Sequence, residues 1–161
     1  MMVSDWSDFN VAMAGATAAL AGLVIVASSV NIAEIVKSRA LTARLLAGIA
    51  ALVLALAVSA MALVPDVDPR WLGGLTIVAT LLASVFQVNA TRLIARDPDP
   101  GDRARPMKYL IGFLPILAYL AAGVAIALGH PAGMHVAAAG AILAVASALV
   151  VSWVALVEVL R

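Results

Sequence analysis

Neutral polar side chains recur at helical spacing in an uncharged stretch that is long enough to cross a bilayer. Asn10, Thr17, Ser28 and Asn31 fall on one face of a helix, because residues three and four apart lie on the same side. Amides and hydroxyls can line a hydrated path for an ion or small solute, or they can form hydrogen bonds between helices. Glu34 follows Asn31 by one turn and is the only acid near this end of the stretch.

A second polar face lies in the third apolar stretch, where hydroxyls and an amide repeat at intervals of three or four. At about 1.5 Å per residue, Gln87 lies at a depth similar to that of Asn31 and Ser152. Because an unsatisfied polar group in hydrocarbon costs several kcal/mol, these groups should face one another or a hydrated cavity. Hydrogen bonding that only fixes helix register is the alternative. The candidates for a pore lining or polar cluster are Asn10, Thr17, Ser28, Asn31, Glu34, Thr80, Ser84, Gln87 and Ser152.

Small residues and one proline also have a predicted role. Gly15, Ala19 and Gly22 form a small-residue face of the kind that packs closely against another helix, in the same subunit or in a second copy. Pro115 should kink the fourth helix and leave the carbonyl of Ile111, one turn earlier, without its helical donor.

Signals for catalysis and metal binding are missing from the sequence. There is no cysteine, no HExxH, GxSxG or phosphate-loop motif, and no paired carboxylates at membrane depth. His130 and His135 fall outside the apolar core, at a spacing that matches no metal-ligand motif. We therefore expect no catalytic residue, no metal and no cofactor, and we expect that the protein is not an enzyme. Its small net charge of +1 gives no reason to expect a nucleic-acid partner.

The elements that must position these residues are transmembrane helices. The chain has 161 residues, of which 65% are hydrophobic and 12% charged, whereas soluble domains contain about 25% charged residues. A helix that spans a membrane needs about 20 residues, and five apolar segments of the chain are close to that length. They cover residues 9–35, 41–64, 71–94, 107–128 and 134–160. We predict an all-α, five-helix membrane bundle that forms a single transmembrane domain over residues 1–161.

The distribution of lysine and arginine predicts the orientation of the bundle. With the N-terminus outside, Arg70 is the one basic residue of the ten that falls on the outer side, beside Asp66 and Asp68. An excess of basic residues in short loops marks the cytoplasmic side, so we predict N-outside and C-inside. The residues on the inner side are Lys37, Arg39, Arg44, Arg92, Arg96, Arg103, Arg105, Lys108 and Arg161. Glu34 can form an interfacial ion pair there, with Lys37 or with Arg44.

The first helix resembles that of a family of small bacterial membrane proteins. The residues from Gly15 to Asn31 follow a GAxAALxGLxxVAxSxN-like pattern, Trp6 precedes it, and Arg44 and Leu63-Val64-Pro65 fit the second helix of that family. The resemblance covers mainly the first 65 residues. It implies a five-helix, multi-pass protein of the bacterial inner membrane, and the family has no established function.

Three functions fit these observations. The first hypothesis is a homo-oligomeric channel for an ion or small solute, in which the first helix lines the path. The alternative is a non-catalytic accessory or scaffold subunit, whose polar faces dock a larger membrane protein partner. A small carrier with its binding site near Pro115 is the third. The expected partners are the lipid bilayer, further copies of the chain and a membrane protein.

Overall fold

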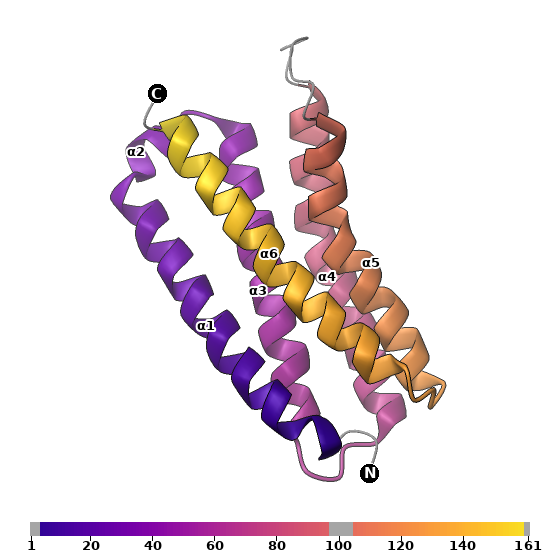
Figure 1. Ribbon diagram of the computed structural model, residues 1–161. Helices are drawn as coiled ribbons and strands as arrows, with labels where there is room; N and C mark the ends of the chain where they lie inside the picture. The colour runs from indigo at the N-terminus through magenta and orange to yellow at the C-terminus, as the bar shows by residue number, and fades with distance from the viewer. Residues whose placement is uncertain (1–3, 97–104, 160–161) are drawn as a thin grey trace.

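The computed structural model describes residues 4–96 and 105–159, and these residues are all-helical apart from short turns. A single 3-10 turn, η1 (Ser4–Trp6), leads into six helices (Figure 1). Five helices in the described part of the chain are long and apolar enough to cross a membrane. The six helices are α1 (Ser7–Val30), α2 (Ile32–Ile35), α3 (Arg39–Ala62), α4 (Pro69–Arg96), α5 (Arg105–Ala127) and α6 (Gly133–Val159).

Helix α3 is the central element of the bundle. It packs against α1, α4 and α6, and α5 completes a four-helix arrangement by packing against both α4 and α6. Helix α1 lies outside these four helices, where it contacts mainly α3 (Figure 1). Only four residues of α1 are buried, namely Asn10, Thr17, Ala21 and Val24. The first helix is therefore a peripheral element that follows one face of α3.

The two ends of the bundle differ in charge. We call the end that carries Asp5, Asp8, Asp66 and Asp68 the acidic end, and its only described basic residue is Arg70. Lys37, Arg39, Arg44 and Arg92 lie toward the opposite end, which we call the basic end. Helices α5 and α6 meet at the acidic end and diverge toward the basic end (Figure 1).

Local sequence signals set the turns at the acidic end. Asp68 accepts a hydrogen bond from the backbone N–H of Arg70 (2.8 Å), and Pro69 occupies the first position of α4, where its missing N–H costs nothing. Helix α5 ends at Ala127, and Gly129 follows in the turn with a φ of 71°, the left-handed conformation that glycine adopts without strain. The N–H groups of Gly129 and His130 then bond to the carbonyls of Ile126 and Ala125, as in a Schellman motif.

The predicted first segment, residues 9–35, is not one continuous helix. Helix α1 ends at Val30, Asn31 departs from helical geometry with φ −111° and ψ 20°, and α2 is a separate turn. The Asn31 side chain bonds back to the carbonyl of Ala27 (3.4 Å), so its amide satisfies a backbone group that the break exposes. The other four predicted segments agree with α3 to α6 to within a few residues.

Helices α4 and α5 approach most closely in the acidic half of the bundle. A Cβ atom on Gly73 would collide with the backbone N of Ala127 and lie 2.6 Å from the carbonyl oxygen of Gly123. The ring of Tyr119 lies against Gly140 of α6 and is buried in the main hydrophobic core. Glycines therefore permit backbone contact where the four helices converge.

Candidate functional site

A cavity of about 130 Å³ lies between α3, α4, α5 and α6, in the half of the bundle where the helices diverge. Three polar side chains line it, each from a different helix: Arg44 of α3, Gln87 of α4 and Ser147 of α6. Its remaining walls are alanine, glycine and branched aliphatic residues. We call this space the Arg44 cavity.

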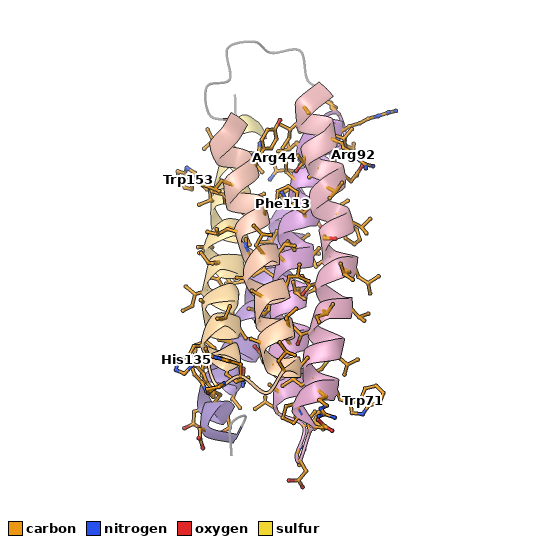
Figure 2. The ribbon with its side chains drawn as sticks, turned by 90° about the vertical axis from the view of Figure 1, so that its right-hand side faces the viewer. Arg44, Trp71, Arg92, Phe113, His135 and Trp153 are labelled. Carbon is orange, nitrogen blue, oxygen red and sulfur yellow. The ribbon has the colours of Figure 1, made fainter. Side chains whose placement is uncertain are left out.

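Small residues on α3 make room for the cavity. Arg44 lies near the start of α3, and Ala47, Gly48 and Ala51 follow it along the same wall. Arg44 is partly buried, and in the view of Figure 2 it is seen between α4 and α5. Arg92 of α4 lies at the same end, but it is exposed and is not part of the cavity wall (Figure 2). The two arginines therefore form a natural pair of test residue and control.

The wall opposite Arg44 combines an amide with a weakened stretch of helix. Gln87 packs directly on Gly112 of α5, and a Cβ atom on Gly112 would collide with the Gln87 amide. Pro115 has no N–H, so it cannot donate to the carbonyl of Ile111, which belongs to the cavity wall. The carbonyl group that Pro115 is predicted to free therefore belongs to a residue of the cavity wall.

The lining of the Arg44 cavity suits an anion that carries a small apolar body. A guanidinium has five N–H donors in a planar fork, so it can hold a carboxylate while it keeps another partner. The Gln87 amide and the Ser147 hydroxyl add neutral donors, and the apolar walls match a hydrocarbon group. In size, the space approaches an engineered cavity of about 150 Å³ that binds benzene.

Two of the four residues on the polar face of the first helix are buried, and the other two are half-buried. Asn10 and Thr17 are buried on the face of α1 that packs against α3. Thr17 donates to the carbonyl of Met13 (2.6 Å), and Ser28 donates to that of Val24 (2.7 Å). Hydroxyls that bond one turn back are satisfied within their own helix. This placement favours helix packing, the alternative considered for the polar face, over the lining of a path.

The predicted polar face on α4 has the same character. The Thr80 hydroxyl is buried and donates to the carbonyl of Thr76 (2.6 Å). Ser84 donates to the carbonyl of Leu81 (2.7 Å). Of the three candidates on this helix, Gln87 is the one that lines the Arg44 cavity.

The predicted inner cluster divides between two cavities. Ser28, Asn31 and Ser152 do lie together, around a space of about 20 Å³ between α1, α3 and α6. Gln87 is part of the separate Arg44 cavity. Glu34 lies on α2, where it is exposed and pairs with Lys37 at 2.6 Å, which confirms the predicted ion pair between these two residues.

The predicted packing face of the first helix has no partner in the described chain. Gly15, Ala19 and Gly22 are exposed, and a Cβ atom on Gly15 or Gly22 would meet no neighbour within 4 Å. The face that packs against α3 instead carries Asn10 and Thr17. Close packing of small residues occurs elsewhere, between Gly73 of α4 and Gly123 of α5.

A second, much smaller cavity lies in the acidic half and joins three polar residues. Asn10 of α1, Ser59 of α3 and Tyr119 of α5 line a space of about 10 Å³, which we call the Tyr119 cavity. Trp6 and Phe9 lie over it, and Trp6 makes edge-to-face contacts with Phe9 and His135. Among the described residues, neither the Asn10 Nδ2 atom nor the Tyr119 hydroxyl has a hydrogen-bond partner.

Arg44 and Ser147 were not predicted as site residues. Arg44 was assigned to the cytoplasmic interface, and Ser147 was not singled out. One signal was available: Arg44 lies one turn inside an apolar segment, ahead of Ala47, Gly48 and Ala51. A charge followed on one face by small residues predicts space beside that charge.

Among the described residues, no group of three or more histidine, cysteine or acidic side chains is placed to hold a metal ion. A scan against protein-family models, a search of curated proteins and a search of solved structures each found no match.

Proposed function

We propose that this protein is a small membrane carrier that binds a monocarboxylate in the Arg44 cavity. The observation that carries the proposal is the cavity itself, where one guanidinium, one amide and one hydroxyl from three helices face an otherwise apolar space. An ionisable residue within a membrane bundle marks a functional site by default. This assignment develops the third function considered from the sequence, because the cavity wall includes Ile111 and Gly112, one turn from Pro115.

The surface of the bundle supports a position in the membrane. Large apolar side chains are exposed along α1, including Leu23, which is 65% exposed. Between α3 and α4, a groove of about 390 Å³ is lined entirely by apolar side chains, among them Val53 and Phe86. Trp71 and Trp153, both 71% exposed, point outward near opposite ends of the bundle, as expected of aromatic belts (Figure 2).

The charge asymmetry supports an orientation with the acidic end outside and the basic end in the cytoplasm. In this orientation the Arg44 cavity lies in the inner half of a bacterial inner membrane, where it would receive its ligand from the cytoplasm or the inner leaflet. The positive side chains of Lys37, Arg39 and Arg92 would raise the local concentration of anions at that end.

The channel hypothesis has less structural support than the carrier. A path lined by the first helix needs the polar face of α1 to meet water, but that face packs against α3. A central pore would require α1 to turn or to leave α3 when copies assemble. The Arg44 cavity needs no rearrangement to present its polar groups.

Isothermal titration of the protein in nanodiscs tests the binding site with three probes of one shape. Benzoate, benzamide and benzylamine differ mainly in the charge of one substituent. We expect benzoate to bind more tightly than the other two. In Arg44→Gln the benzoate affinity should fall at least about tenfold, because hydrogen bonds to charged groups contribute about 1.5–3 kcal/mol.

Arg92→Gln is the matched control, since it removes the same charge at the same end but outside the cavity. Its benzoate affinity should stay within about twofold of the parent protein. If no probe binds, or if the two variants lose equal affinity, the proposed site is wrong. Uptake of labelled benzoate into proteoliposomes then separates a carrier from a binding protein that does not transport.

Single cysteines test the orientation, since the natural chain has none. We expect Asp68→Cys to react with a membrane-impermeant maleimide in intact cells. Lys37→Cys should react only after the membrane is opened. The reverse pattern would place the Arg44 cavity on the outer side.

A further inference from the structure

We infer that one water molecule is bound inside the Tyr119 cavity and joins α1 to α5 by hydrogen bonds. The inference is independent of the proposed carrier function, because the Tyr119 cavity and the Arg44 cavity have no lining residue in common and the Tyr119 cavity lies wholly in the acidic half of the bundle. It concerns Asn10, a predicted candidate for a pore lining or a polar cluster.

Two buried polar atoms point to a ligand at this place. Asn10 is 5% exposed and Tyr119 is 1% exposed, yet the Asn10 Nδ2 atom and the Tyr119 hydroxyl have no hydrogen-bond partner in the part of the chain that the structure describes. An amide or hydroxyl left without a hydrogen bond in an apolar environment destabilises the folded protein. Both residues line the same cavity, so one small molecule between them would satisfy both.

The size and chemistry of the cavity select water. A space of about 10 Å³ is close to the roughly 10–15 Å³ that a single water molecule needs, and it excludes larger solutes. The Asn10 Nδ2 group can only donate, so its ligand must accept a hydrogen bond, which a metal or ammonium cation cannot do. Water accepts from Asn10 and can donate to or accept from the Tyr119 hydroxyl. Ser59, 3% exposed, supplies a third polar group at the same cavity.

Aromatic residues close the cavity toward the acidic end. Trp6 and Phe9 line it, and the Trp6 ring stands edge-to-face to Phe9 at a centroid distance of 5.7 Å and to His135 at 4.8 Å. These rings separate the water from bulk solvent. Asn10 is one of only four buried residues of α1, so a bridge through it adds a polar contact to the packing of this helix against α3.

Thermal unfolding of the protein in nanodiscs, followed by tryptophan fluorescence, tests the bridge. Tyr119→Phe removes only the hydroxyl. If water satisfies that hydroxyl, the variant loses a hydrogen bond and we expect its Tm to fall by about 2–4 °C. Asn10→Leu should lower Tm as well. The Tm of the double variant should be no lower than that of the less stable single variant, because both substitutions remove the same bridge.

Thr80→Val is the control, because Thr80 is equally buried but its hydroxyl bonds within α4. Its effect should add to that of Asn10→Leu, since the two residues share no partner. An unchanged or raised Tm in Tyr119→Phe would overturn the inference, because the removal of an unsatisfied hydroxyl costs nothing. So would an experimental map at about 2 Å resolution in which Asn10 and Tyr119 bond directly without water.

Discussion

The Tyr119 cavity and the Arg44 cavity use polar residues in opposite ways. The first is about 10 Å³, neutral, and closed by aromatic rings in the half of the bundle where the helices converge. The second is about 130 Å³, carries a permanent positive charge, and lies where α5 and α6 diverge (Figure 1). Asn10 and Gln87 are both amides within apolar helices, yet the space around each gives it a different role.

The comparison shows that residue type alone does not identify a binding site in a membrane bundle. Polar residues at closely packed positions satisfy one another, their own helix or a single water. The same residues at a loosely packed position can bind a solute. Packing density therefore decides between the two, and glycine and alanine control it at several positions. Alanine substitutions at four glycines test this difference.

The largest effect is expected where α4 and α5 touch in the acidic half. A methyl group at Gly73 would collide with the backbone at Gly123 and Ala127, and backbone atoms cannot move aside as a flexible side chain can. We expect Gly73→Ala to destabilise the protein by about 3 kcal/mol, seen as a large fall in Tm or a loss of monodisperse protein.

Two matched substitutions show whether the loss depends on a close backbone contact, one in the same half of the bundle and one beside the Arg44 cavity. A Cβ atom on Gly74 meets nothing within 4 Å, and one on Gly48, beside the Arg44 cavity, makes only ordinary contacts of 3.7 Å or more. Both alanine variants should be neutral, or stabilising by up to about 1 kcal/mol. Equal losses in all three variants would contradict the proposed difference between the two halves.

An intermediate effect is expected at Gly112 in the basic half. A methyl group there must displace the Gln87 amide, which can move because it is the end of a flexible side chain. We expect Gly112→Ala to change benzoate affinity by about tenfold, equivalent to 1.4 kcal/mol, with little change in Tm. Titration and thermal unfolding of the same preparation would measure both. A large fall in Tm instead would show that Gly112 is a packing residue like Gly73.

The smallest effect is expected for the ion pair between Glu34 and Lys37. Both side chains are more than half exposed, so their attraction is screened by solvent. Glu34→Gln should cost about 0.3 kcal/mol and leave benzoate affinity unchanged. Altered solute uptake in this variant would restore Glu34 as a candidate at the mouth of a path.

Much of the fold follows from the sequence because long apolar segments and turn residues are local signals. Pro69 after Asp68, and Gly129 before Pro131, mark helix ends without reference to any neighbour. The break at Asn31 was missed because both sides of it are apolar and the hydropathy pattern continues through it. An asparagine at a helix end is a weaker signal than a proline or glycine.

The candidate site was harder to predict because it depends on how the helices are tilted. The sequence indicated that Gln87 needs a partner or a hydrated space, and that Pro115 frees a carbonyl. It could not show that Arg44 and Ser147, about 100 residues apart, line one cavity. The polar face of α1 was recognised, but periodicity alone does not distinguish a face that packs against α3 from one that meets water.

The peripheral position of α1 has a consequence for the synthesis of the protein. Of the five long helices, α1 leaves the ribosome first, but its main packing partner, α3, is made later. In a membrane, α1 must therefore remain stable in lipid until α3 has been inserted beside it. The connection through α2 is short, so α1 and α3 can pair before α4 is complete. The helix pair joined by α2 would then be the first folded unit, onto which the remaining helices assemble.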